Sequence, residues 1–133
     1  MPTVKTKILL VEYNDFIKDA LKKSLEIEGY DVVTVKTALE GIKTAKKEQF
    51  DVTIADYELP DANGIEFFLL IRRFCSEFVS ILMTTYGELK TMSDIYSYGI
   101  TDAIEKPFSV DKLIELIEKN LQKSKKGQHG KAI

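Results

Sequence analysis

The sequence predicts an α/β fold of the doubly wound (βα)₅ type, in which five parallel strands alternate with five helices. Two patterns indicate this class: short apolar runs recur five times, and the segments between them have helical periodicity. A length of 133 residues suits one domain. With 44% hydrophobic and 30% charged residues, the composition is that of an ordinary globular protein and excludes a disordered chain.

The five apolar runs are the predicted strands. They lie at Lys7–Val11, Asp31–Val35, Asp51–Ala55, Val79–Thr84 and Thr101–Glu105. Ile8–Val11 and Ile81–Met83 are continuous apolar runs, which are typical of parallel strands that are buried on both faces. Asp31–Val35 alternates less cleanly between apolar and polar residues, which favours a place near the edge of the sheet.

The helices between the strands carry start and stop signals. Thr37 and Glu40 have the spacing of a capping box, so a helix is expected to begin there. Gly29 and Gly99 are expected to end the first and fourth helices in a backbone conformation with positive φ. The fifth helix has one apolar stripe, which we expect to pack on the sheet and which consists of Val110, Leu113, Ile114, Ile117 and Leu121.

Charge divides the chain into a body and a tail. Segment 123–133 contains lysines and no acidic residue, although the whole chain has a net charge of −2. We place the domain at residues 1–122 and expect 123–133 to be a basic, disordered tail or the start of a linker. An acidic body argues against nucleic acid as a direct partner.

The sequence also bears on the compartment. No apolar run approaches the roughly 20 residues that span a bilayer, and the amino terminus lacks the pattern of a signal peptide. The single cysteine, Cys75, excludes an intrachain disulfide, and a free thiol is typical of a reducing compartment. We therefore expect a cytoplasmic protein without membrane insertion.

Chemically active residues follow four of the predicted strands. Glu12 follows the first strand, Asp56 the third, Thr84 ends the fourth and Lys106 follows the fifth. Because ligands of open α/β sheets bind beyond the carboxyl ends of the strands, these side chains are expected to share one site. The acidic loop after the first strand repels nucleotide phosphates and suits a hard cation with oxygen ligands. A lysine, a hydroxyl and a metal around one carboxylate favour a transient aspartyl-phosphate on Asp56.

Four motifs, ILLVE, DVTIADYELPDANG, ILMTTYGE and DAIEKPF, together carry a family resemblance. Over about residues 5–122 the chain resembles the receiver domains of response regulators in two-component signalling, and within them the chemotaxis regulators. The resemblance implies a flavodoxin-like fold with strand order 2-1-3-4-5. It also implies that Asp56 accepts a phosphoryl group from the phosphohistidine of a sensor histidine kinase or a phosphotransfer protein. Lys106 would pair with the phosphoryl oxygens, and the Thr84 hydroxyl would move towards them and start the conformational switch.

The resemblance further implies a cofactor, Mg²⁺. Its ligands would be the carboxylates of Glu12 and Asp56 and the backbone carbonyl of Glu58. The bond between Lys106 and Pro107 is expected to be cis, as in the family, which the tertiary amide of an X-Pro bond permits. Asn63-Gly64 corresponds to the turn before the third helix.

Two positions depart from the family pattern. Tyr13 stands where a second acidic residue is expected, and its phenol is neutral at pH 7, so weak Mg²⁺ binding and slow or absent phosphorylation follow as a hypothesis. Asn14 and Asp15 are poor substitutes if the helix begins there. Ala103 stands where receivers carry the aromatic ring of the switch, so the switch aromatic is absent.

The output surface is expected by family analogy. It is the face of the fourth helix, the fifth strand and the fifth helix, which would dock a downstream effector or output domain or form a homodimer. Its expected residues include Met92, Ile95, Tyr96 and Tyr98.

Three functions remain open. The first is a phosphoacceptor receiver of a phosphorelay, which at most phosphorylates and dephosphorylates itself and is not a turnover enzyme. The second is a receiver-like interaction module that has weakened or lost its Mg²⁺-dependent phosphorylation. The third, a distant alternative, is a small phosphatase with Asp56 as its nucleophile, because Asp56 and Glu58 follow an apolar strand.

Overall fold

Five parallel strands form one sheet in the order β2-β1-β3-β4-β5, as predicted. The structure, a computed structural model, describes residues 4–75, 77–85 and 92–131. The strands are β1 (Lys7–Val11), β2 (Asp31–Val35), β3 (Val52–Asp56), β4 (Val79–Thr84) and β5 (Asp102–Glu105). Three of the five predicted strands have these bounds, β3 is shifted by one residue and β5 starts one residue late. Strand β2 lies at the edge, which its weaker apolar pattern indicated.

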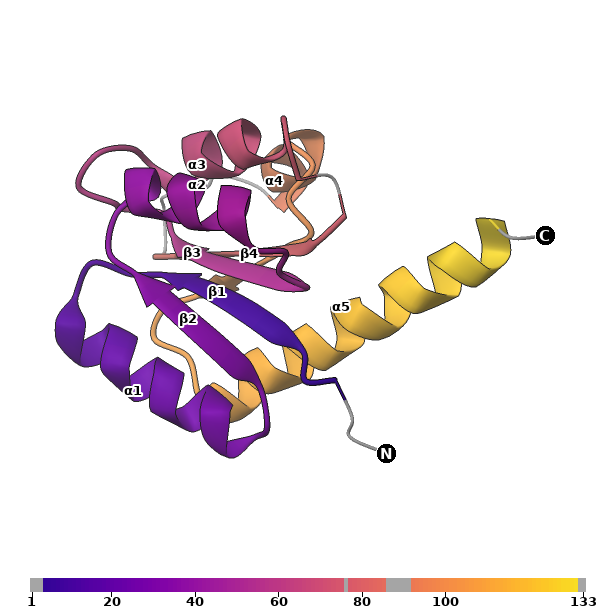
Figure 1. The fold of residues 1–133 in the computed structure, drawn as a ribbon, viewed down its shortest axis with the longest axis horizontal. Helices are drawn as coiled ribbons and strands as arrows, with labels where there is room; N and C mark the ends of the chain where they lie inside the picture. Colours follow the sequence, from indigo (N-terminus) through magenta and orange to yellow (C-terminus); the bar gives the residue numbers. More distant parts are fainter. Residues whose placement is uncertain (1–3, 76, 86–91, 132–133) are drawn as a thin grey trace.

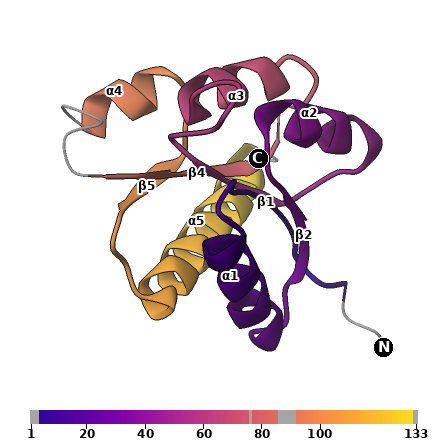
Figure 2. The same ribbon diagram turned by 90° about the vertical axis from the view of Figure 1, so that its left-hand side faces the viewer.

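Helices cover both faces of the sheet (Figures 1 and 2). They are α1 (Asp15–Ile27), α2 (Ala38–Lys47), α3 (Gly64–Ile71), α4 (Met92–Ser97) and α5 (Val110–Lys131). In both views α2, α3 and α4 lie on one face, and α1 and α5 lie on the other. The (βα)₅ fold is therefore confirmed. None of the helices in the described part of the chain is long and apolar enough to cross a membrane.

The sheet divides the core into two parts, as the inner strand β1 illustrates. Ile8 and Leu10 face the layer of α1 and α5, and Leu9 and Val11 face the layer of α2, α3 and α4. All four side chains are fully buried, because a parallel strand covered on both faces exposes neither set of alternating side chains. The predicted stripe of α5 is confirmed, since its members lie in or against the first of these clusters.

Helix ends follow the sequence signals with one exception. Gly29 and Gly99 have φ values of 100° and 79°, as predicted for helix-terminating glycines. The hydroxyl of Thr37 accepts from the backbone N–H of Glu40 at 3.1 Å, but the Glu40 carboxylate accepts from the Thr37 hydroxyl and not from the Thr37 backbone N–H. The complete capping box lies at α3, where Asn63 and Glu66 satisfy each other's backbone N–H groups.

Helix α5 continues beyond the predicted domain end. It is helical to Lys131 and extends past the edge of the sheet (Figure 1), whereas the sequence predicts a disordered tail after residue 122. The physical reason is that a helix grows readily from a turn that is already packed, and lysine and glutamine are good helix formers. The division of the chain into a domain and a tail at residue 122 stays a prediction.

Gly41 of α2 lies against the buried ring of Phe67 from α3. A Cβ atom at position 41 would lie 2.7 Å from a ring carbon of Phe67 and 3.3 Å from a methyl group of Val11. We expect Gly41→Ala to lower the free energy of unfolding by about 1–3 kcal/mol through overpacking, although alanine is the better helix former by about 1 kcal/mol. Urea denaturation measures this change, and Lys43→Ala on the exposed face of α2 is the control. A stabilised Gly41→Ala variant would contradict the packing argument.

Candidate functional site

The predicted site residues Glu12, Asp56 and Lys106 meet at the carboxyl edge of the sheet. The Nζ atom of Lys106 lies 2.7 Å from Oδ2 of Asp56 and 3.5 Å from Oε1 of Glu12. Glu12 is 2% exposed and Asp56 is 8% exposed, so both carboxylates are buried. One ammonium group therefore lies between two buried carboxylates.

The parallel topology places these residues together. Asp56 is the last residue of β3, Glu12 directly follows β1, and Lys106 directly follows β5. The backbone N–H of Lys106 donates to the carbonyl oxygen of Thr84 at 2.7 Å, which brings the ends of β4 and β5 level. The predicted cis bond between Lys106 and Pro107 is present. Thr84 is buried at the end of β4, and its hydroxyl donates to the carbonyl of Thr85 at 3.3 Å.

The loop from Asp56 to α3 is held tightly against the strand. The backbone N–H of Gly64 donates to the carbonyl of Tyr57 at 2.8 Å. A Cβ atom at position 64 would lie 2.6 Å from the carbonyl oxygen of Asp56, so a glycine is needed where α3 begins. The backbone N–H of Glu58 donates to Oδ1 of Asp56 at 3.3 Å, which leaves Oδ2 to Lys106.

Asp61 helps to hold the loop beside the site, and the sequence reasoning missed it. Its two carboxylate oxygens accept from the backbone N–H groups of Ala38 and Leu39, each at 2.9 Å. Although partial burial raises the pKa of Asp61, these hydrogen bonds outweigh it and hold the pKa below its ordinary value. The contact ties the loop after Asp56 to the first turn of α2. No local pattern signals a contact between residues this far apart in the chain.

The electrostatics of the site follow from burial and close charges. Burial, together with the charge of Asp56, raises the pKa of Glu12 above its ordinary value, against the opposing effects of the Asn14 N–H and Lys106. Burial lowers the pKa of Lys106, but the hydrogen bond and charge of Asp56 and the charge of Glu12 outweigh it, so the net pKa is raised. Lys106 is therefore a cation at every physiological pH.

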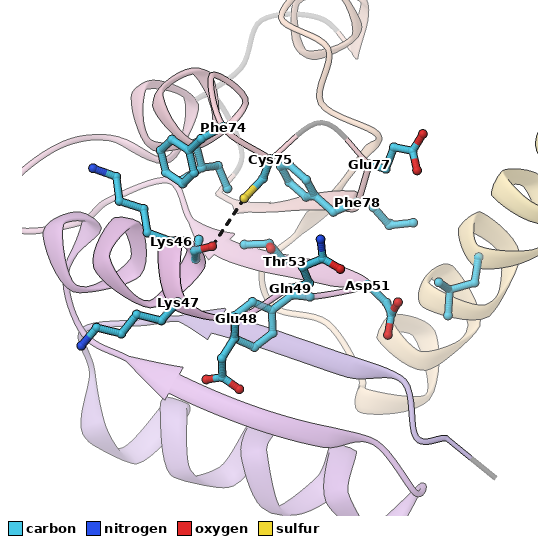
Figure 3. Close-up of a pocket in the computed structure, with 15 residues that line it drawn as sticks. Lys46, Lys47, Glu48, Gln49, Asp51, Thr53, Phe74, Cys75, Glu77 and Phe78 are labelled. Carbon is cyan, nitrogen blue, oxygen red and sulfur yellow. Dashed lines mark hydrogen bonds between the residues drawn. The ribbon is translucent and has the colours of Figure 1, made fainter.

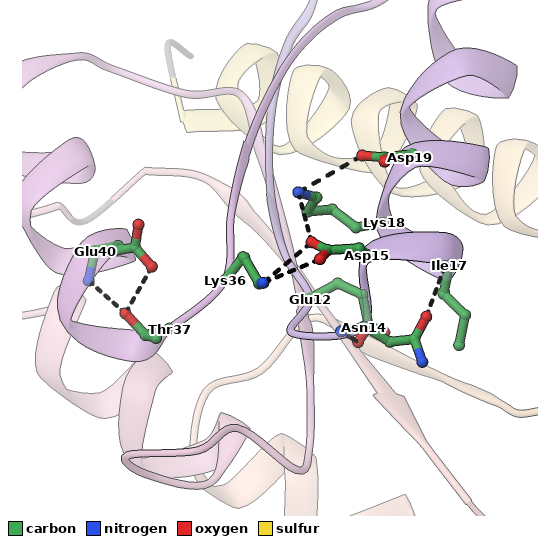
Figure 4. A network of polar contacts seen from close by, with 9 residues as sticks. All are labelled: Glu12, Asn14, Asp15, Ile17, Lys18, Asp19, Lys36, Thr37 and Glu40. Carbon is green, nitrogen blue, oxygen red and sulfur yellow. Dashed lines mark hydrogen bonds and ion pairs between the residues drawn. The ribbon is translucent and has the colours of Figure 1, made fainter.

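Tyr13 and the residues after it have other contacts. Tyr13 is 54% exposed, and Nζ of Lys36 lies 5.0 Å from the centre of its ring. Figure 4 shows the neighbouring network, in which Asp15 pairs with Lys36 at 3.1 Å and with Lys18 at 3.2 Å. The Asn14 side chain caps α1 by accepting from the N–H of Ile17. Asn14 and Asp15 are thus engaged with other groups, as expected if the helix begins there.

The oxygen ligands at the site are of the type that Mg²⁺ prefers, but they are few. Carboxylate oxygens are the ligands that Mg²⁺ prefers, and Glu12 and Asp56 supply two such groups side by side. Within residues 4–75, 77–85 and 92–131, no group of three or more His, Cys, Asp or Glu side chains is placed to hold a metal ion. The side chain of Glu58 is exposed, so its backbone carbonyl is the group left for such a role.

One residue of the predicted output face is misplaced. Ile95 is fully buried in the core beneath α4, whereas Tyr96 and Tyr98 are 53% and 41% exposed. The prediction that Ile95 contributes to this surface is wrong, because a helix that packs on a sheet presents alternate sides to core and solvent. The side chain of Met92 lies outside the described residues. Ala103 is half-buried against the same core, and neither tyrosine is buried beside it.

A surface hollow of about 830 Å³ lies at the amino ends of the strands, opposite the candidate site (Figure 3). It is lined by the ends of α2 and α3 and by the starts of β3 and β4, and its side chains include Phe50, Phe74, Cys75 and Phe78. Cys75 follows α3 and is half-buried, with its thiol 3.5 Å from the carbonyl oxygen of Ala45. Since Asp56 and Lys106 do not line this hollow, the candidate site is the smaller polar cluster.

Glu12 gives a pH-dependent test of the site. Because its pKa is raised in the folded state, the stability that Glu12 contributes is fully present below its ordinary pKa of 4.5 and is lost as pH rises through the raised value. Glutamine does not ionise, so we expect Glu12→Gln to stabilise the protein by about 1 kcal/mol at pH 7, because it removes a buried charge next to that of Asp56. Thermal unfolding between pH 4 and 8 measures this gain. It should shrink towards acid pH, and the exposed Glu26→Gln control should show no such trend.

Comparisons with known proteins agree with the fold and the motifs. Residues 8–118 match the family described as the response regulator receiver domain. Among curated proteins, sporulation initiation phosphotransferase F of Bacillus subtilis is 28% identical over 115 residues, which are 86% of this chain and 93% of that protein. Response regulator protein FleR of Pseudomonas aeruginosa is 29% identical over 86% of this chain, but the chain spans 24% of FleR.

Solved structures give the same result. A CheY-like response regulator receiver domain protein from Methanospirillum hungatei is 30% identical and has a TM-score of 0.87, over 93% of this chain and 99% of that one. The chemotaxis response regulator CheY4 of Vibrio cholerae is 25% identical with a TM-score of 0.79, over 88% and 99% of the two chains. The chain therefore belongs to the response regulator receiver domains of two-component signal transduction.

Proposed function

We propose that this receiver domain is a phosphoacceptor of a two-component phosphorelay. In this proposal, Asp56 takes a phosphoryl group from the phosphohistidine of a sensor histidine kinase or a phosphotransfer protein. The observation that carries the proposal is the 2.7 Å contact between Nζ of Lys106 and Oδ2 of Asp56, at the edge where Glu12 and Thr84 also lie. The similarity to a protein named a phosphotransferase, over 93% of its length, adds support.

The chemistry needs few groups. A carboxylate oxygen of Asp56 attacks phosphorus, the bond from phosphorus to the donor imidazole nitrogen breaks, and the imidazole leaves with its electron pair and takes up a proton. Lys106, held beside Asp56, balances the negative charge that the phosphoryl oxygens bring into the buried site. Water later hydrolyses the acyl phosphate to inorganic phosphate and restores the Asp56 carboxylate, and in this proposal that step is slow, so the domain serves as a switch and not as a turnover enzyme.

Magnesium has a supporting part in this proposal. The residues that would hold it are Glu12, Asp56 and the backbone carbonyl of Glu58, and the ion would supply charge neutralisation at the phosphoryl oxygens. The Glu12 carboxylate is buried at the site and would act as an anionic ligand, whereas Tyr13 supplies no negative charge there. We therefore propose that Mg²⁺ binds weakly in this protein.

The output is proposed to pass through the side of the domain formed by α4, β5 and α5. The Thr84 hydroxyl lies at the end of β4, between the strands that carry Asp56 and precede Lys106. Its movement towards a phosphoryl group would change the end of β4, which precedes α4 in the chain. Tyr96 and Tyr98 are the exposed side chains there that a downstream effector or a second copy would contact.

The proposed location of these events is the cytoplasm.

A second function is favoured by the surroundings of Tyr13. The ring is exposed and has the Lys36 ammonium over its face, so an aromatic and cationic group stands where a second metal-binding acid is expected. A domain with this arrangement can serve as a receiver-like interaction module whose Mg²⁺-dependent phosphorylation is weakened or lost.

Replacement of Asp56 separates a phosphoacceptor from an interaction module. We expect acetyl phosphate, with Mg²⁺ at about 10 mM, to add one phosphoryl group to the native protein and none to Asp56→Asn, as measured by intact mass. Glu58→Gln is the matched control, because its side chain is exposed and the proposal uses its backbone alone. The native protein should react slowly. A native protein that stays unmodified while folded would favour the interaction module.

Replacement of Tyr13 tests the proposed weakness of the metal site. We expect Tyr13→Asp to tighten Mg²⁺ binding about tenfold or more, because an added carboxylate gives the hard cation a third anionic ligand. Tyr13→Asn is the control, since it removes the same ring and its contact with Lys36 without adding charge. Titration of Mg²⁺ followed by backbone amide shifts of Glu12 and Asp56 gives both affinities. Equal affinities in the two variants, or tight binding by the native protein, would contradict the diagnosis.

A further inference from the structure

Arg72 makes a long-range contact that joins α3 to the end of α4. Its Nη1 group donates to the carbonyl oxygen of Tyr98 at 2.6 Å, although the two residues lie 26 positions apart in the chain. Arg72 is the C-terminal cap of α3, and Tyr98 directly follows α4. The side chain of one helix end therefore satisfies the backbone of the next helix end.

The same contact limits the space around Gly99. A Cβ atom at this position would overlap the Arg72 guanidinium and displace it, so the contact with Tyr98 depends on the absence of a side chain there, and the positive φ of 79° favours glycine as well. The turn is closed by bonds from the N–H of Gly99 to the carbonyl of Tyr96 and from the N–H of Ile100 to the carbonyl of Ile95. Local bonds thus use the carbonyls of α4 itself, and Arg72 donates to the carbonyl of Tyr98, the first residue after the helix.

The other end of α3 rests on the proposed phosphoacceptor. Gly64, its first residue, has its Cα so close to Asp56 that an added Cβ would lie 2.6 Å from the Asp56 carbonyl oxygen. Between the two ends, Phe67, Phe68 and Ile71 are buried in the core. Helix α3 has 8 residues, and with this packing we expect it to move as one body, because a close-packed interior does not deform continuously.

We propose that Arg72 is a positioning residue that makes α4 follow α3, so that a displacement at Asp56 reaches the exposed tyrosines of α4. The proposal deepens the regulation of the site and rests on the proposed phosphoacceptor function. It gives the domain a connection to the face with Tyr96 and Tyr98 that does not need an aromatic ring at Ala103. The guanidinium is suited to this contact because it is always charged and its donors have a fixed geometry.

The test compares Arg72→Met with Arg73→Met. Arg73 is the neighbouring exposed arginine, and no hydrogen bond or ion pair of its side chain is found among the described residues, so it controls for loss of one positive charge. Backbone amide shifts are recorded for both variants and for the native protein, with and without beryllofluoride and Mg²⁺ as a stable mimic of the phosphoryl group. Amide hydrogen exchange of Gly99 and Ile100 is measured without the mimic.

The expected result has two parts. Without the mimic, Arg72→Met speeds exchange at Gly99 and Ile100 about tenfold, which is the effect of losing one charged hydrogen bond, while Arg73→Met leaves it unchanged. With the mimic, all three proteins shift at Tyr57 and Glu58, and in Arg72→Met the shifts at Tyr98 and Gly99 fall by at least half. Arg72→Lys, which keeps the charge, should lie between the native protein and Arg72→Met.

The outcomes separate this inference from the proposed function. Shifts at Tyr57 and Glu58 with unchanged shifts at Tyr98 and Gly99 in Arg72→Met would overturn the coupling and leave the phosphoacceptor intact. A native protein with no shift at Tyr57 and Glu58 would overturn the phosphoacceptor. In that case hydrogen exchange decides, because native-like exchange at Gly99 in Arg72→Met would mean that Arg72 does not hold α4.

Discussion

The burial of two carboxylates beside one ammonium group is the constraint on which the rest of the structure depends. Glu12 and Asp56 are nearly inaccessible to solvent, and ionised groups in such places are costly unless they are paired and hydrogen-bonded. Lys106 pairs with both carboxylates. The backbone N–H of Asn14 donates to the other oxygen of Glu12, and the backbone N–H of Glu58 donates to the other oxygen of Asp56. The strand ends must therefore stay level, because every member of the cluster comes from a different strand or the loop after it.

The replacement of an expected acid by Tyr13 fits this constraint. A third carboxylate at the same edge would add repulsion to a cluster whose single lysine already serves two acids, and burial already raises the pKa of Glu12. With Tyr13, the ring lies in solvent under the Lys36 ammonium, and the cluster carries one negative charge less. Under the proposed function, the same change would also weaken the attraction for a divalent cation, so the stability of the resting domain and the proposed phosphorylation would make opposite demands on position 13.

The loops around the cluster are held by contacts between residues far apart in the chain. Asp61 binds the first turn of α2, Gly64 lies against Asp56, and Arg72 holds the end of α4. These contacts surround α3 at both ends, which makes that helix the element shared by the site and the exposed face with Tyr96. In the proposed coupling, α3 would join the two regions without an aromatic ring at position 103, where the sequence has alanine.

Periodicity and strand-end chemistry by themselves determined the strands, the helices and the meeting of Glu12, Asp56 and Lys106, because these depend on local patterns and on where parallel strands end, while the strand order came from the family resemblance. The misplacement of Ile95 shows where this reasoning stops, since a family analogy does not fix the rotation of a short helix on its sheet. Tertiary structure alone decided that Asp61 binds the first turn of α2 and that Arg72 reaches Tyr98. Such contacts have no pattern in the sequence, because they arise only after packing has brought distant helix ends together.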